Sequence, residues 1–231
     1  MANKLCKFGF LPARQSVFLL CDLQEKFRPA LTYFEEIVQS AAKLASEPTD
    51  LQDLEMAHLY CLRDKCVKVS EVMGIPLIVT EQNPKSLGPT VNDIKKDHAK
   101  GVFAKTKFSM CTPEVIDELK KIPDLKCAVL FGIETHACIE QTAIDLLGQD
   151  LHVHVVADAC TSRSLEDRQL AFERMKQMGC FISTTENVIF KLLLDARNPK
   201  FGEIRSLVKD VTPYTGLCRL HSSGKFGQNK L

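Results

Sequence analysis

Short, continuous apolar runs alternate with stretches of helical periodicity along most of this chain. The first, Val17 to Asp22, is apolar up to its final carboxylate, and the run Ala128 to Phe131 has no polar face. Such runs are typical of parallel strands covered on both sides. The six predicted strands lie at residues 17–22, 76–80, 102–105, 128–131, 151–158 and 180–183. With helices between them, the alternation predicts an α/β fold, a three-layer, doubly wound, mostly parallel six-stranded sheet.

The length of 231 residues suits a single α/β domain with a sizeable core. We expect residues 1–13 to form an N-terminal arm and residues 14–210 to form the domain. A helical insertion is predicted within it at residues 46–65. The polar, serine- and glycine-containing residues 211–231 are expected to form a flexible C-terminal tail.

The charge balance and the apolar content limit the classes of partner. A formal net charge of +1 argues against nucleic acid or an anionic membrane as the main partner. No run approaches the ~18 apolar residues that a membrane span needs. We therefore expect a small-molecule substrate, no nucleic acid and no membrane as partners.

Ten cysteines are present, several of them inside predicted strands or helices and none in a C-x-x-C pair. In a chain this long, that usage favours a reduced, intracellular protein with mostly buried thiols over a disulfide framework. We expect a cytoplasmic location. Mitochondrial or peroxisomal locations are the alternatives, since Asn229-Lys230-Leu231 is one residue away from a peroxisomal address.

Cys138 is the one cysteine whose sequence context indicates a catalytic role. Gly132 marks the join between a buried strand and a helical pattern that begins near Ala137, so Cys138 is predicted in the first turn of that helix. The free N–H groups and partial positive charge of a helix start favour a thiolate and supply donors for an oxyanion. The alternative is a buried structural thiol, which is the commoner fate of cysteine.

Asp22, Lys105 and Cys138 each fall at or just past the end of a different predicted strand. Reactive groups collect at the carboxyl edge of a parallel sheet, where the strand order reverses. We therefore expect this acid, cation and thiol to meet. The alternatives are that Asp22 caps a turn and that Lys105 is a solvated charge, as expected for Lys107.

Five further residues are candidates for substrate binding, because they follow strand ends or adjoin the candidate thiol. They are Phe27, Glu81, Gln82, His136 and Arg163. Glu81 and Gln82 open a long loop, residues 81–101, and long ordered loops are usually functional. His136 is interpreted as shaping the pocket rather than as the base of a Cys–His pair. The polar residues around Arg163 are explained nearly as well by a helix cap at Ser164 as by contact with a substrate.

Several ordered motifs resemble the isochorismatase-like cysteine hydrolases, over roughly residues 14 to 210. They are Leu20-Cys-Asp22-Leu-Gln, Lys105-Thr-Lys-Phe-Ser109 and Gly132-Ile-Glu-Thr-His-Ala-Cys138-Ile. The motifs Asp158-Ala-Cys-Thr-Ser-Arg163-Ser and Thr80-Glu-Gln-Asn-Pro are closer to the eukaryotic isochorismatase domain-containing proteins. The resemblance implies an Asp22–Lys105–Cys138 catalytic triad. It also implies a cis Ile133–Glu134 peptide, with the N–H groups of Glu134 and Cys138 as the oxyanion hole.

Two features depart from the family pattern. Residues 46–65 look like an insertion. The metal-binding Asp-x-His…His set of nicotinamidase relatives is also missing, since residues 81–101 offer only His98. We therefore expect no metal and no cofactor. His152 and His154 alternate on a strand, which we interpret as a strand face rather than a metal pair.

The resemblance predicts a metal-independent cysteine hydrolase that attacks a small amide or related carbonyl through a thioester. One alternative is an isochorismate-type vinyl-ether hydrolase without a covalent step. Another is a non-catalytic small-molecule-binding or scaffold protein. Parallel α/β proteins of this kind often assemble, so a homo-oligomer is expected. The substrate itself cannot be inferred from the sequence.

Overall fold

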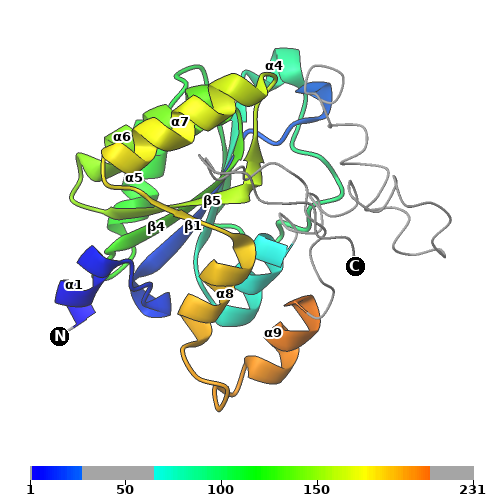
Figure 1. The fold of residues 1–231 in the computed structure, drawn as a ribbon. Helices are drawn as coiled ribbons and strands as arrows, with labels where there is room; N and C mark the ends of the chain where they lie inside the picture. Colours follow the sequence, from blue (N-terminus) through cyan, green and yellow to red (C-terminus); the bar gives the residue numbers. More distant parts are fainter. Residues whose placement is uncertain (1, 28–64, 209–231) are drawn as a thin grey trace, which may run out of the picture.

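The computed structural model describes residues 2–27 and 65–208. The predicted tail and almost all of the predicted 46–65 insertion lie outside these described residues. In the described part, the chain forms a six-stranded sheet with strand order β3-β2-β1-β4-β5-β6, and every neighbouring pair is parallel (Figure 1). The strands are β1 (Ser16–Cys21), β2 (Leu77–Gln82), β3 (Gly101–Lys105), β4 (Cys127–Ile133), β5 (His152–Thr161) and β6 (Phe181–Ser183). The predicted fold class is confirmed.

The strand order reverses beside β1. The chain first moves outward from β1 through β2 to β3, then returns to the other side of β1 as β4. The last residue of β1, Cys21, pairs with Thr80 on one side and with Gly132 on the other. The carboxyl end of β1 is therefore the topological switch point, the place where open α/β sheets bind ligands.

Helices cover both faces of the sheet (Figure 1). One face carries α5 (Pro113–Lys120), α6 (Glu140–Leu147) and α7 (Leu165–Gln177), and the other carries the helix at residues 65–73 and α8 (Thr185–Leu193). Helix α9 (Phe201–Val208) packs against α8. The short elements are α1 (Ala2–Leu5), η1 (Cys6–Phe8), η2 (Ala13–Gln15), η3 (Glu25–Phe27), α4 (Pro84–Leu87) and η4 (Thr135–Ile139). No helix among the described residues combines the length and the apolar character required to cross a membrane.

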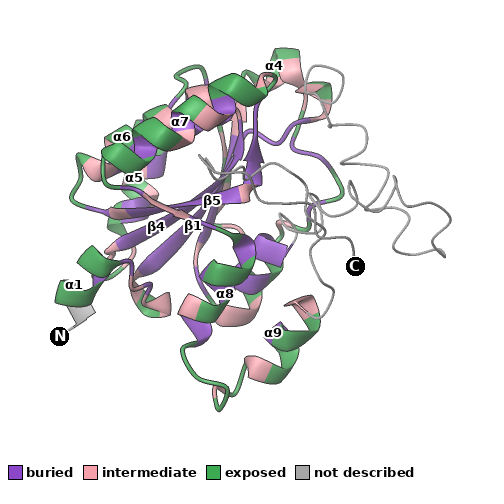
Figure 2. Cartoon of the chain, in the orientation of Figure 1, coloured by how far each residue is buried: buried purple, intermediate pink, exposed green. Residues whose placement is uncertain are grey.

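The core lies in the middle of the sheet, where every residue of β1 and β4 is buried (Figure 2). Phe18 and Phe131 meet edge to face across these strands, with ring centroids 6.0 Å apart. This burial on both faces explains why the two strands read as continuous apolar runs. The helix cap predicted at Ser164 also forms, since Ser164 accepts from the Asp167 N–H. Thr112 caps α5 in the same way by accepting from the Val115 N–H.

Strand β5 continues past its predicted end at Asp158 to Thr161. Its pairing with β4 shifts register between Leu130 and Gly132, which marks an irregularity in the ladder. The buried Arg168 guanidinium donates to the carbonyl oxygens of Ala157 and Cys160 at this irregularity. A buried side chain from α7 thus supplies hydrogen-bond donors to the backbone at the irregularity.

Candidate active site

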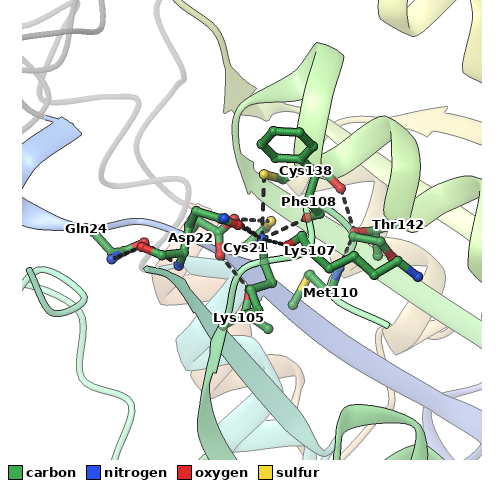
Figure 3. Close-up of polar contacts among 12 residues, drawn as sticks. Cys21, Asp22, Gln24, Lys105, Lys107, Phe108, Met110, Cys138 and Thr142 are labelled. Atoms are coloured by element: carbon green, nitrogen blue, oxygen red, sulfur yellow. Dashed lines mark hydrogen bonds and ion pairs between the residues drawn. The ribbon is translucent and has the colours of Figure 1, made fainter. Parts of the chain in front are cut away.

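Asp22, Lys105 and Cys138 come together at the carboxyl edge of the sheet (Figure 3). Asp22 directly follows β1, Lys105 ends β3, and Cys138 lies in η4, the turn after β4. The Lys105 Nζ atom lies 2.6 Å from Oδ2 of Asp22 and 3.6 Å from Sγ of Cys138. A carboxylate oxygen of Asp22 and the Cys138 sulfur lie within 4.8 Å of each other. The three residues singled out in the sequence thus share one buried centre.

The carboxylate of Asp22 is fixed by its neighbours on the adjacent strand. The Asp22 backbone has φ 48°, so β1 ends there, and its N–H donates to the carbonyl of Thr80 at 3.1 Å. The Thr80 hydroxyl donates to Oδ1 of Asp22 at 2.8 Å. One carboxylate oxygen therefore accepts a neutral hydrogen bond while the other faces the Lys105 ammonium.

The Lys105 ammonium is surrounded by acceptors. It donates to Oε1 of Gln82 at 2.6 Å and to the carbonyl oxygens of Lys107 and Phe108 at 3.2 and 2.7 Å. Burial by itself lowers the pKa of this amine, but the neighbouring Cys21, Asp22 and Cys138 outweigh it, so the net pKa of Lys105 is raised. Lys105 is therefore a buried, charged ammonium and not a solvated surface cation.

Gln82 and Glu81 have different surroundings at the end of β2. Besides accepting from Lys105, the Gln82 side chain donates to the carbonyl of Thr106 at 2.8 Å, and its backbone N–H donates to Oε1 of Gln24 at 2.7 Å. The Glu81 carboxylate accepts from the N–H and the hydroxyl of Thr90, at 2.6 and 2.7 Å. These bonds anchor the start of the 81–101 loop to the sheet edge. A role of either residue in substrate binding stays a prediction.

Cys138 lies in a π-helical turn that precedes α6, rather than in the first turn of an α-helix. Its side chain is buried, with 7% of the residue exposed. The Glu134 carbonyl accepts from the N–H groups of Ala137 and Ile139, which shapes the turn. The peptide bond between Ile133 and Glu134 is cis, as the resemblance implied.

Gly132 permits the close approach of β4 to β1. Its φ is +129°, and a Cβ atom at this position would lie 2.2 Å from the carbonyl oxygen of Cys21. Only glycine fits such a position without displacing the backbone. The predicted role of Gly132 at the strand-to-turn junction therefore has a steric cause.

The hydroxyl of Thr142 connects two segments of the site. It accepts from the Met110 N–H at 2.9 Å and donates to the Cys138 carbonyl at 2.5 Å (Figure 3). Met110 belongs to the segment that follows Lys105, and Thr142 lies in α6. Sequence reasoning did not single out Thr142, because nothing in its spacing distinguishes it from other helical threonines.

Cys21 is a second thiol at the centre, and sequence reasoning placed it only in a strand. Its Sγ donates to Oδ2 of Asp22 at 3.4 Å and lies within 4.8 Å of the Cys138 sulfur. Burial, then its hydrogen bond with Cys138 and the charge of Asp22, raise the pKa of Cys21 well above the usual range. The signal in the sequence was its position directly before Asp22, at a strand end.

Cys21, Asp22 and Cys138 are also the group within the described ranges whose ligand atoms are close enough to hold a metal ion. The Lys105 ammonium already lies 2.6 Å from the carboxylate, so a metal cation would meet another positive charge there. The donor set therefore fits a charged ion pair better than a metal site.

Of the other predicted residues, His136 and Arg163 make contacts at the turn that carries Cys138. Nδ1 of His136 lies 3.0 Å from the Ser162 hydroxyl, which also accepts from the Thr135 N–H. Arg163 donates from its N–H and Nε to the Glu134 carboxylate, at 3.1 and 3.2 Å, and its side chain is 65% exposed. Phe27 is half-buried in η3 and packs against the core. Their predicted substrate contacts remain predictions.

His154 is buried in β5 and stacks on Phe181, with ring centroids 4.8 Å apart. Burial, assisted by the charges of Lys191 and His152, lowers the pKa of His154 to about 3. A neutral, stacked ring accords with the interpretation of this pair as a strand face.

Known proteins resemble this chain along most of its length. The family model described as "Isochorismatase domain" matches residues 16–187. Isochorismatase domain-containing protein 2 of Xenopus laevis is 44% identical over 218 residues, which cover 94% of this chain and 95% of the relative.

Solved structures share the fold. A structure described as that of MAR1 ribonuclease from Caenorhabditis elegans superposes with a TM-score of 0.75 at 39% identity, covering 91% of this chain and 97% of that one. The Escherichia coli YcaC product, described as an octameric hydrolase of unknown specificity, shares the fold with a TM-score of 0.64 at 21% identity, covering 85% of this chain and 89% of that one.

Proposed function

Because the chain belongs to the isochorismatase family, we propose that it is a metal-independent cysteine hydrolase whose nucleophile is Cys138. The observation that carries the proposal is the contact of the Cys138 sulfur with the Lys105 ammonium at 3.6 Å. A positive charge at this distance favours a thiolate over a thiol. The thiolate is the form of cysteine that attacks carbonyl carbon.

Asp22 is proposed as the group that receives the thiol proton. Its carboxylate lies within 4.8 Å of the Cys138 sulfur, and Lys105 contacts both groups. The ammonium holds the carboxylate in place and stabilises the thiolate after the proton has left. The expected catalytic triad therefore acts as one coupled unit.

The proposed reaction is hydrolysis of a small amide or related carbonyl compound. The Cys138 thiolate adds to the carbonyl carbon, and the resulting oxyanion accepts hydrogen bonds from the N–H groups of Glu134 and Cys138. Asp22 returns the proton to the leaving amine, the C–N bond breaks, and a thioester remains on Cys138. Water deprotonated by Asp22 then adds to the thioester and releases the acid and the thiol.

A panel of small primary amides, assayed by ammonia release, tests the proposal. We expect turnover of at least one amide, an acyl adduct on the 135–140 segment by mass spectrometry, and loss of both in Cys138→Ser. Cys180→Ala is the matched control, because Cys180 is another buried thiol but lies directly before β6. Full activity of Cys138→Ser would refute the nucleophile.

The alternatives give different results in the same panel. Turnover of a vinyl ether without an adduct would support acid catalysis by Asp22 instead. A small molecule that raises the melting temperature without turnover would support a binding protein. RNA belongs in the panel because the similar Caenorhabditis elegans protein is described as a ribonuclease. The 7% exposure of Cys138 favours a small reacting group over a folded polynucleotide.

We also propose that the protein assembles as a homo-oligomer. The E. coli YcaC product, which shares the fold and is described as octameric, supports this proposal. Native mass spectrometry and light scattering coupled to size exclusion measure the assembly directly. A mass equal to that of one 25.9 kDa chain at micromolar concentration would contradict it.

A further inference from the structure

Cys21 has no task in the proposed hydrolysis, although its thiol occupies the same buried centre as the nucleophile. The Cys21 and Cys138 sulfur atoms lie within 4.8 Å of each other, and both contact the Asp22–Lys105 pair. Cys21 is at the end of β1, and Cys138 is in the turn after the neighbouring strand β4. Two thiols remote in sequence are thereby placed side by side.

The two thiols differ in exposure and in the groups that they contact. Cys138 is 7% exposed and faces the Lys105 ammonium, whereas Cys21 is fully buried and donates its S–H to Oδ2 of Asp22. A small oxidant reaches Cys138 first, and a thiolate reacts faster than a thiol. Cys21 is the more deeply buried of the two. It is placed to act as a resolving thiol, the thiol that attacks an oxidised cysteine to form a disulfide.

We propose that Cys21 and Cys138 form a reversible intramolecular disulfide when the site meets hydrogen peroxide. The pair is thus a modification site that switches the nucleophile off and protects it from irreversible oxidation. The proposal rests on the proposed function only for the reactivity of Cys138.

The oxidation proceeds in two steps. The Cys138 thiolate attacks one peroxide oxygen, the O–O bond breaks, and hydroxide leaves and takes up the proton that the thiol had lost, giving water. The sulfur of Cys138 is oxidised by two electrons to a sulfenic acid.

In the second step, Cys21 passes its proton to Asp22 and attacks the sulfenic sulfur. The S–O bond breaks, and the leaving hydroxide takes that proton from Asp22 as a second water. Two thiols and one hydrogen peroxide become one disulfide and two waters.

Asp22 is suited to serve either thiol. Its Oδ2 already accepts from Cys21 at 3.4 Å and lies 2.6 Å from the Lys105 ammonium. Closing the S–S bond to its length of about 2.05 Å requires the two sulfur atoms to move toward each other. The Cys138 side chain lies on a turn rather than in a strand, so this movement falls mainly on η4.

Peptide mapping of the full-length protein tests the proposal directly. The reduced protein is treated with hydrogen peroxide, denatured, alkylated and cut with trypsin and a glutamate-specific protease. Residues 15–25 then carry Cys21 as their only cysteine, and residues 135–140 carry only Cys138. We expect a linked pair of these two peptides, lighter by two hydrogens than their sum and released by dithiothreitol.

Substitutions test whether Cys21 is the resolving thiol or takes no part in the oxidation. In Cys21→Ala, we expect a dimedone-reactive sulfenic acid at Cys138 that proceeds to sulfinic acid and is not restored by dithiothreitol. Cys180→Ala should keep the linked peptide, because Cys180 lies directly before β6, away from the Cys21–Cys138 pair. Cys21→Ser provides a polar replacement of similar size. Peptide mapping of the wild-type chain shows whether the Cys21–Cys138 disulfide forms even where a variant does not fold.

The outcomes distinguish this proposal from the hydrolase proposal. Sulfinic acid at Cys138 of the wild-type chain without the linked peptide would overturn the disulfide alone. A disulfide between Cys138 and another cysteine would also overturn it. Absence of any reaction of Cys138 with peroxide and with iodoacetamide would overturn both, because neither allows an inert thiol.

Discussion

The Nζ atom of Lys105 lies 2.6 Å from Oδ2 of Asp22, and the two side chains are 0% and 1% exposed. Desolvation of two charges is offset here by their attraction and by the further acceptors around the ammonium. Breaking such a pair is costly because the remaining charge stays buried without its partner. The pair is therefore a requirement of the fold as well as of the proposed chemistry.

Lys105→Met should destabilise the protein by about 3–5 kcal/mol, because it leaves the Asp22 carboxylate buried and uncompensated. Urea unfolding followed by circular dichroism measures the change. Lys107→Met is the matched control, since the Lys107 side chain is 54% exposed and pairs with Asp145 at the surface. That control should cost about 1 kcal/mol or less.

The double variant Asp22→Asn/Lys105→Met isolates the interaction between the two charges. We expect it to be more stable than Lys105→Met, because the uncompensated carboxylate is gone. Strict additivity of the two single changes would show that the ion pair contributes no coupling.

Thr80→Val tests the hydrogen bond that positions Asp22. The substitution keeps the shape of the side chain but removes the hydroxyl that donates to Oδ1 at 2.8 Å. A hydrogen bond to a charged group contributes about 1.5–3 kcal/mol, so stability should fall by that amount. The alkylation rate of Cys138 by iodoacetamide should change as well. Thr80→Ser retains the hydroxyl, and a loss equal to that of Thr80→Val would contradict the role of this bond.

Gly132→Ala should be among the most damaging single-methyl additions in the chain. Its φ of +129° is strained for alanine, and the new Cβ would lie 2.2 Å from the Cys21 carbonyl oxygen. We expect a loss of about 3 kcal/mol or more, measured by thermal and urea unfolding. Gly74→Ala is the control, because Gly74 also has a positive φ, +66°, but no atom within 4 Å of the added Cβ. It should cost about 1–2 kcal/mol.

Because His154 is buried in its neutral form, we expect the free energy of unfolding to fall in acid. Its folded-state pKa of about 3 lies below the ordinary 6.5, so the unfolded chain binds the proton more readily. The neutral ring makes its full contribution to the free energy of unfolding above pH 6.5. This contribution is lost as the pH falls toward 3, by up to about 1.4 kcal/mol per pH unit. Urea unfolding between pH 7 and pH 4 should show this slope in the wild type and a smaller one in His154→Leu. His152→Gln, a half-buried neighbour on the same strand, should keep most of it.

The sheet and the meeting of three strand-end residues could be predicted because they depend on backbone periodicity alone. Continuous apolar runs locate buried parallel strands, and the ends of such strands share one edge. Asp158 shows where this reasoning fails. The pattern predicts that the strand ends at this residue, but β5 continues to Thr161, and the Asp158 carboxylate accepts from the N–H and hydroxyl of Thr185.

The surroundings of the site could not be predicted, because they depend on side-chain directions that periodicity does not encode. Cys21 has the pattern of one more apolar strand residue, and the positive φ of Asp22, the next residue, is not encoded in residue spacing. Thr80 likewise reaches Asp22 through the pairing of β1 with β2, which is specified by the whole sheet. The π-helical turn around Cys138 differs from an α-helix by one hydrogen-bond step, a difference that residue spacing does not reveal.

The single hydroxyl of Thr142 has a consequence for how the molecule responds to what it binds. It joins the main chain after Lys105 to the main chain of Cys138. We therefore expect a displacement of residues 106–110 to be transmitted to the turn that carries Cys138. One side chain in α6 thus holds two loops of the sheet edge in a fixed relative position.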